Sequence, residues 1–159
     1  MKRRHLLLCL FSAAVLMGIT VLLSGESATG SVPECDSIIS TFFGKVEAGD
    51  FGGAIDFVYA NNPWMANKVD DIQSLKSQFM GLPQITGKYL GHEFMIEEEM
   101  TAKIIYVNHI VYMERQPLRF YFLFYKVNDQ WMTYSFGYTD DLDEWIEEKI
   151  KTDYIYSKQ

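Results

Sequence analysis

Apolar residues recur at helical spacing in the segment that follows residue 30. The first series has steps of three and one, which place its members on one face of an α-helix: Cys35, Ile38, Ile39, Phe42, Phe43 and Val46. Gly49 and Asp50 end this helix, and the same pattern predicts a second one over 51–59, which Asn61-Asn62-Pro63 ends.

Two further helices are predicted, one on each side of a strand-rich region. The first is capped by Asp70 or Asp71 and is expected to end before Gly81 and Pro83. The last begins at 139–141, with Asp141 and Glu144 placed as a capping box. Its apolar side consists of Leu142, Trp145, Ile146 and Ile150.

From residue 88 onward the apolar pattern has a period of two, and the segment is rich in Tyr, Phe, Ile and Val. This pattern predicts β-strands. Short breaks at Glu99-Met100, at 115–117 and at Asn128-Asp129 divide the segment into an antiparallel meander. The four predicted strands are 89–98, 102–114, 118–127 and 130–139.

Alternation and turn positions determine which side chains share a face of this sheet. Both faces are apolar, so we expect each of them to be covered. One face is predicted to hold Leu90, His92, Phe94, Ile96, Ile105, Val107, His109, Val111, Met113, Leu118, Phe120, Phe122, Phe124, Trp131, Thr133, Ser135 and Gly137. The other is predicted to hold Tyr89, Glu93, Met95, Tyr106, Ile110, Tyr112, Arg119, Tyr121, Leu123, Tyr125, Met132, Tyr134, Phe136 and Tyr138.

The N-terminus has the three parts of a secretory signal. Lys2, Arg3 and Arg4 precede an uncharged apolar run over 6–23, and small residues follow it. We therefore expect residues 1–30 to be a signal peptide and residues 31–159 to be secreted or periplasmic. The run also reaches the lower length limit of a membrane span, so an uncleaved inner-membrane anchor over 6–23 is the alternative. The small residues after the run favour cleavage near 28–30.

Residues 31–159 are long enough for one domain with a core and too short for two. They carry 11 basic and 20 acidic residues, a net charge of −9. This charge argues against nucleic acid and anionic membrane surfaces as partners. Cys35 is the only cysteine of this part, which excludes an internal disulfide, and its place on the apolar face predicts a buried thiol.

The order of helices and strands, together with the Gly-Asp pair inside 46–59 (Val-Glu-Ala-Gly-Asp-Phe-Gly-Gly-Ala-Ile-Asp-Phe-Val-Tyr), resembles the nuclear transport factor 2-like superfamily, also called SnoaL-like. The resemblance covers about residues 35–139. It implies an α+β fold in which N-terminal helices pack on a strongly curved, cone-shaped antiparallel sheet, and the C-terminal helix is an addition to it. Enzymes of the superfamily use a Tyr or His with an Asp inside the cone, but none of their catalytic residues can be placed on this chain position by position.

A ligand pocket is predicted on the face that carries the two histidines of the domain. His92 is expected opposite Val107, so that His109 is its diagonal neighbour at roughly 7–8 Å. Two imidazoles in a cavity could bind a ligand or transfer a proton, whereas two hydrogen-bonded core histidines are the structural alternative. Trp131, Thr133 and Ser135 would complete the pocket. This face supplies no third metal ligand and the chain has no cofactor motif, so we predict neither metal nor cofactor.

The tyrosine-rich face is predicted to bind a second copy of the chain or another envelope protein, because protein interfaces are enriched in Tyr, Phe, Met and Arg. The predicted interface residues are Tyr106, Tyr112, Arg119, Tyr121, Leu123, Tyr125, Tyr134 and Tyr138. Alternatively, the C-terminal helix folds back and covers this face within one chain.

Together these patterns predict an exported binding or interaction module, for a small apolar ligand or a protein partner, and favour a protein that is not an enzyme. Two alternatives stay open: a small-molecule isomerase, lyase or hydrolase with a histidine as general base, and a structural subunit of an envelope assembly. The interior of the cone distinguishes them. An enzyme needs a polar cavity around the histidines, a binder needs an apolar one, and a structural subunit has a filled cone.

Overall fold

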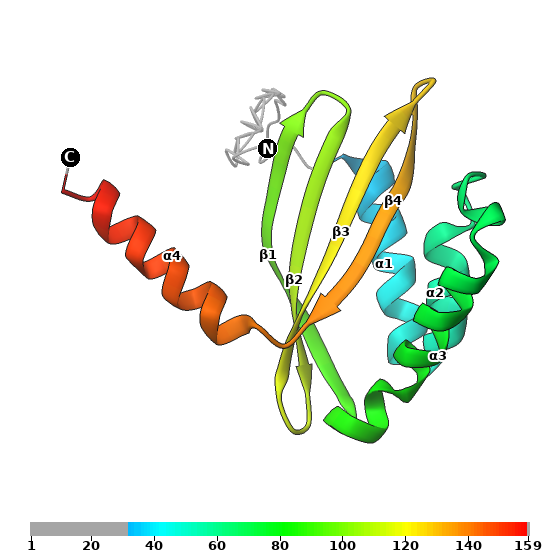
Figure 1. The fold of residues 1–159 in the computed structure, drawn as a ribbon, viewed down its shortest axis with the longest axis horizontal. Coiled ribbons are helices and arrows are strands. Elements are labelled where there is room, and N and C mark those ends of the chain that lie inside the picture. The colour runs from blue at the N-terminus through cyan, green and yellow to red at the C-terminus, as the bar shows by residue number, and fades with distance from the viewer. Residues whose placement is uncertain (1–31, 159) are drawn as a thin grey trace, which may run out of the picture.

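The computed structural model describes residues 32–158, in which three helices precede a four-stranded sheet and one helix follows it (Figure 1). The strands are antiparallel and lie in the order β1-β2-β3-β4. The elements are α1 (Pro33–Glu47), α2 (Phe51–Tyr59), the 3-10 helix η1 (Met65–Asn67), α3 (Val69–Thr86), β1 (Tyr89–Thr101), β2 (Ile104–Met113), β3 (Pro117–Val127), β4 (Gln130–Thr139) and α4 (Leu142–Tyr156).

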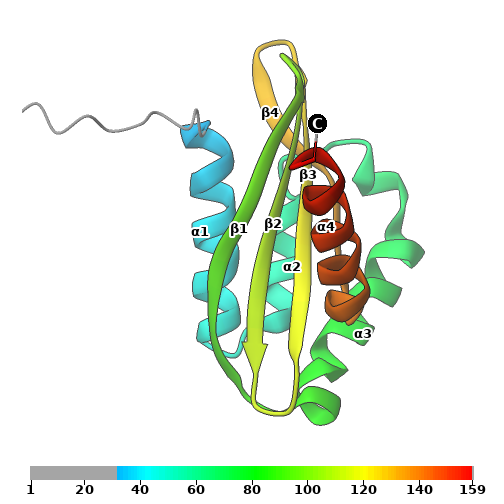
Figure 2. The ribbon, with the colours of Figure 1, turned by 90° about the vertical axis from the view of Figure 1, so that its left-hand side faces the viewer.

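The sheet has an inner face, which α1, α2 and α3 cover, and an outer face, on whose side α4 projects (Figures 1 and 2). The predicted α+β class, a curved antiparallel sheet with N-terminal helices and an extra C-terminal helix, is confirmed, and so is the element order that the superfamily resemblance implies. None of the helices among residues 32–158 is long and apolar enough to cross a membrane. The predicted signal peptide lies outside the described residues.

Phenylalanine rings fill the space between the helices and the inner face. The ring of Phe42 on α1 lies 5.2 Å from that of Phe122 on β3, 4.7 Å from that of Phe136 on β4 and 5.8 Å from that of Phe79 on α3. All four side chains are almost completely buried. Cys35 is buried too, as predicted, and burial raises the pKa of its thiol to about 12, so the thiol is no nucleophile at neutral pH. Phenylalanine side chains therefore fill the cone, which is the space between the helices and the curved sheet.

Side chains from the end of α2 protect the free edge of β4. The Asn62 side-chain amide donates a hydrogen bond of 2.8 Å to the carbonyl of Thr133, and that of Asn61 donates one of 3.0 Å to the carbonyl of Trp131. Unpaired strand edges tend to pair with other chains. The two asparagines that end α2 therefore also block this edge.

The third helix differs from its prediction at both ends. Its N-cap is Lys68, and Asp70 and Asp71 lie inside its first turn without capping it. The helix also continues through Gly81 and Pro83 to Thr86. The physical reason is burial: Phe79, Leu82 and Thr86 recur at helical spacing on the core side, and their burial outweighs the hydrogen bond that Pro83 cannot make.

Bulges in β1 move the first hairpin away from its predicted place. The register shifts at three points, 89–91, 94–96 and 99–101, so β1 runs to Thr101 and the turn lies at Ala102-Lys103 instead of Glu99-Met100. Glu97 lies opposite Val107, the inner-face position that was predicted for His92. Leu90, also predicted to lie inside, is 67% exposed, and Tyr89 packs against the core in its place.

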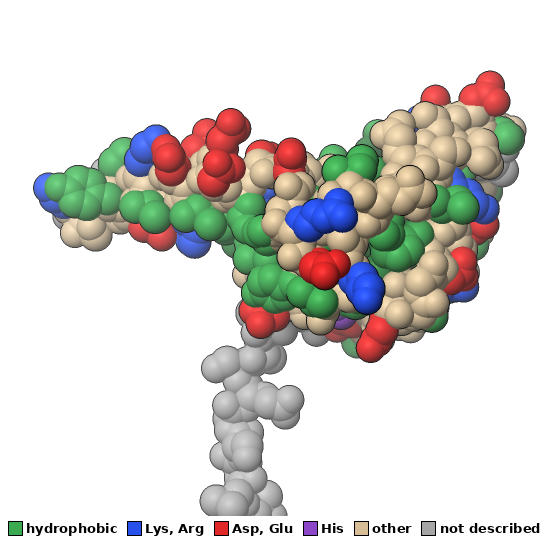
Figure 3. All heavy atoms as spheres, turned by 90° about the horizontal axis from the view of Figure 1, so that it is seen from below, with side chains coloured by type: hydrophobic (Ala, Val, Ile, Leu, Met, Phe, Trp, Pro, Cys, Tyr) green, Lys and Arg blue, Asp and Glu red, His purple; other side chains and the backbone are tan. Residues whose placement is uncertain are grey.

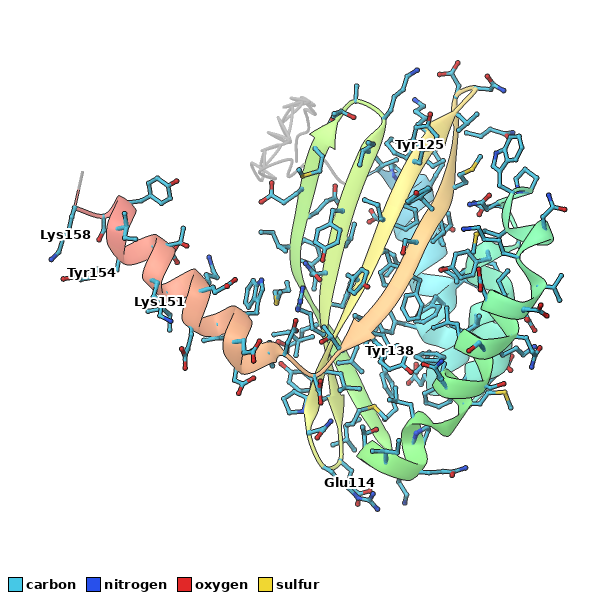
Figure 4. The ribbon with its side chains drawn as sticks, viewed as in Figure 1. Glu114, Tyr125, Tyr138, Lys151, Tyr154 and Lys158 are labelled. Carbon is cyan, nitrogen blue, oxygen red and sulfur yellow. The ribbon has the colours of Figure 1, made fainter. Side chains whose placement is uncertain are left out.

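A bulge in β4 exchanges the faces of its second half. The register shifts where Phe124 pairs with Thr133 and Leu123 pairs with Ser135. Phe136 and Tyr138 therefore point into the core, where the Tyr138 ring lies 5.5 Å from that of Phe79 (Figure 4). Ser135 and Gly137 lie on the outer face instead. The sequence predicted Ser135 and Gly137 on the inner face and Phe136 and Tyr138 on the outer face, and both predictions were wrong. The two large aromatic rings bury more apolar area in the core than Ser and Gly would.

We predict that Asn62→Ala lowers the free energy of unfolding by about 2 kcal/mol, because it leaves the buried Thr133 carbonyl without its donor and the Trp64 N–H without its acceptor. Asn61→Ala is the matched control, since Asn61 makes the same kind of bond from an exposed position and its loss should cost less than about 1 kcal/mol. Urea unfolding at pH 7 measures both values. Equal losses would show that burial of the bond does not matter.

Candidate functional sites

The two histidines lie in a groove between α1 and β1 rather than in the cone. His92 is on β1 opposite Val111, and His109 is on β2 opposite Phe94, so the register differs from the prediction but the two remain diagonal neighbours on one face. Their ring centroids are 5.4 Å apart. The groove has a volume of about 490 Å³, and Asp36, Ser40 and Glu47 of α1 line its other side.

Aromatic packing and one hydrogen bond position the imidazoles. The ring of Phe43 stacks on that of His92 with centroids 3.6 Å apart, and the Tyr89 hydroxyl lies 2.6 Å from His92 Nδ1. The ring of Phe43 also lies 5.0 Å from that of His109. His109 is 6% exposed, and its Nδ1 is buried without a hydrogen-bond partner in the described part of the chain.

Burial governs the charge of both histidines. Burial, with a smaller contribution from the nearby His92, lowers the pKa of His109 to about 4. Burial also lowers the pKa of His92, which the charge of Glu47 partly opposes. A general base works best with a pKa near the working pH and a group that orients it. His109 has neither, so it acts as an aromatic member of the core.

The other predicted pocket residues lie away from the histidines. Thr133 is completely buried on β4, and Trp131 packs at the border of the core. Ser135 lines a separate cavity of about 420 Å³ at the β4 edge, together with Tyr59, Trp64, Met65, Met132 and Tyr134. The five residues predicted to form one ligand pocket therefore do not share a cavity.

The predicted interface residues share the outer face, except at the β4 bulge. Tyr106, Tyr112, Arg119, Tyr121, Leu123 and Tyr125 occupy alternate positions of β2 and β3 on that face. The rings of Tyr106 and Tyr121 are 6.0 Å apart, and Tyr121 lies across Gly137, where a Cβ atom would overlap it. Tyr134 is exposed on the bulge, while Tyr138 is a core residue and no part of this surface.

Two features of the outer face were missed in the sequence. One is a hollow of about 330 Å³ beside the β4 bulge, lined by Ile104, Leu123, Phe124, Tyr125 and Tyr134. The other is Asn108, which alternates with the tyrosines on β2 and is 2% exposed, with its Oδ1 unpaired among the described residues. The alternation along β2 could have placed Asn108, but no pattern predicts the hollow.

An ion pair joins the outer face to α4. The Arg119 guanidinium donates two hydrogen bonds to Asp141 Oδ1, at 3.0 and 3.2 Å, and one to Oδ2, at 2.9 Å. This pairing holds the pKa of Asp141 below its usual value. Asp141 is the N-cap residue of α4, but its carboxylate binds Arg119 and not the helix, so the predicted capping box is absent. No side chain of α4 is buried, and the helix does not fold back over the sheet (Figures 1 and 2).

Comparison with known proteins gives one structural likeness. No family model and no curated protein matches the chain. A solved structure described as an NTF2-like transpeptidase from Campylobacter jejuni is similar to 62% of this chain and 95% of its own, with 12% sequence identity and a TM-score of 0.45. At this identity and TM-score the likeness assigns no activity to this chain.

We predict that His109→Phe removes a pH dependence of stability. The folded pKa of about 4 lies below the unfolded value of about 6.5, so the unfolded chain binds the proton first and stability is lost as the pH falls from 6.5 to 4. This loss should amount to about 2–3 kcal/mol. Phe fits the aromatic surroundings and breaks no bond of Nδ1.

Urea unfolding of both proteins at pH 7, 5.5 and 4 measures the effect. The carboxylates titrate in both proteins, so their contribution cancels in the difference. The free energy of unfolding of His109→Phe should rise relative to that of the unchanged protein as the pH falls. Parallel profiles would show that the pKa of His109 is the same in the folded and the unfolded chain.

Proposed function

We propose that this protein is an exported interaction module that binds a protein partner through the outer face of its sheet. The observation that carries the proposal is the contrast between the two faces. Phenylalanine rings pack the inner face closed, whereas the outer face presents tyrosines that the described residues leave uncovered. A filled cone fits a protein that works through its surface.

The outer face has the composition and shape of a protein-binding surface. Tyr112 is 37% exposed, Tyr125 41% and Tyr134 60%. Aromatic residues of this kind supply much of the binding energy at interfaces, and a partner side chain that fills a hollow supplies more. The hollow of about 330 Å³ beside Leu123 has room for one large side chain.

A small apolar ligand is the second candidate, and the cavity at the β4 edge favours it. Its volume of about 420 Å³ lies in the range of ligand pockets, and apolar side chains dominate its lining. Trp64, at 70% exposure, stands at this cavity and could close over a ligand. The enzyme alternative finds no support at His109, since burial keeps this histidine uncharged and its Nδ1 has no partner among the described residues.

Export rests on the N-terminal residues alone, and we predict that the mature protein begins between residues 26 and 31, because small residues follow the apolar run there. N-terminal sequencing of the protein from the envelope of the cells that make it measures this. An intact Met1 in the membrane fraction would instead indicate the uncleaved anchor.

We predict that a photoreactive phenylalanine analogue at Tyr125, incorporated into the full chain in the cells that make it, crosslinks to a protein. Tyr125 is an aromatic residue of the outer face, so the analogue changes little there. The matched position is Ile85, which is 72% exposed on α3 and should yield severalfold less adduct. Mass spectrometry identifies each adduct. No adduct at Tyr125, or equal adducts at both positions, would overturn the proposal.

A further inference from the structure

We propose that the partner of the outer face is α4 of a second copy of this chain, and that two copies exchange their α4 helices. This inference rests on the proposed function and names its partner. Each α4 then lies across the outer face of the other chain.

Residues 32–158 leave the apolar stripe of α4 half-buried at Leu142 and Trp145 and exposed beyond them. Ile150 is 62% exposed and Tyr156 70%, and no side chain of the helix is buried. A helix of 15 residues is marginal in water on its own and gains its stability from packing one apolar face. The stripe, which falls on one side by helical spacing, consists of Leu142, Trp145, Ile146, Ile150 and Tyr156.

The two charges within the stripe of α4 are paired with each other. Lys149 and Asp153 lie within the stripe and bind each other at 3.3 Å, so together they carry no net charge. The acidic residues Glu144, Glu147 and Glu148 lie on the opposite side by the same spacing. Figure 3 shows hydrophobic side chains running along α4 beside a row of acidic ones. A chain covering the stripe would leave these carboxylates in water.

The stripe and the outer face match in size. At about 1.5 Å per residue α4 is about 22 Å long, which fits within the length of a ten-residue strand, about 33 Å. Aromatic side chains bury about 150–250 Å² each, so the half-exposed apolar groups of the stripe and of the outer face together offer on the order of 800 Å² per chain. A stable interface needs about that area on each partner.

The connection to α4 explains why the partner is a second copy and not the same chain. Only Asp140 and Asp141 separate β4 from α4, and Asp141 is fixed to Arg119 by three hydrogen bonds. The ion pair therefore sets the direction in which α4 leaves the sheet, and the helix points away from its own outer face (Figures 1 and 4). A two-fold dimer uses both uncovered surfaces of both chains, and exchange of an identical element is a known route to such dimers.

Two glutamate variants of the full chain test the exchange. Ile150 and Ile155 have nearly equal exposure, 62% and 59%, but Ile155 lies on the other side of the helix, beside Glu148 and Lys151. Sedimentation equilibrium should show a dimer for the unchanged protein and for Ile155→Glu. For Ile150→Glu the dimer dissociation constant should rise at least about tenfold, since the charge would enter the apolar contact. Circular dichroism verifies that both variants keep their helix content.

Three outcomes overturn the exchange. A monomer at a loading concentration of about 100 μM excludes the dimer. Equal effects of the two variants exclude the stripe as the contact. A dimer that Leu123→Glu dissociates and Ile150→Glu leaves intact shows two sheets packed directly. In each case a crosslink from Tyr125 to a protein would still support the proposed function. The absence of a crosslink would overturn both the proposed function and the helix exchange.

Discussion

The packing of phenylalanine rings between the helices and the sheet is the constraint on which the rest of this structure depends. Phe42, Phe79, Phe122 and Phe136 come from four different elements and meet within one cluster. Because protein interiors are packed as densely as organic crystals, rings of this size leave no room for a ligand between them. Any binding must use the periphery: the groove at the histidines, the cavity at the β4 edge, or the outer face. A rigid core also means that a partner of the outer face meets a sheet that is already formed.

Periodicity predicted the elements because each of them buries one regular face. The series from Cys35 to Val46 is buried as predicted, apart from Ile38 at its border. The Asn128-Asp129 turn followed from local chemistry, since both residues have positive φ, 48° and 62°, which Asn and Asp tolerate well. The faces of β1 and β4 could not be predicted in the same way. One bulge residue reverses the alternation, and in a sheet that is apolar on both sides the pattern does not reveal where the bulge lies.

At the candidate site, too, the sequence predicted the positions of the histidines along the strands but not the side chains that surround them. Spacing placed His92 and His109 on one face, and they are neighbours. Their chemistry depends on Phe43, which comes from α1 and stacks on His92, and on the depth at which His109 lies. The pattern of residues along the strands predicts neither the contact with Phe43 nor the burial of His109. Thr133 and Ser135 were grouped with the histidines on the assumption of one continuous alternation along β4, and the bulge between them separates the two.

Arg119 connects the two surfaces that the described chain leaves uncovered. Its side chain lies on the outer face, 13% exposed, and its guanidinium holds the residue from which α4 starts. A partner that covers the outer face would remove water from this ion pair, and a shielded pair of a guanidinium and a carboxylate with several hydrogen bonds is stronger than an exposed one. Binding at the outer face and the direction of α4 are thereby physically linked, because the same two side chains contribute to both.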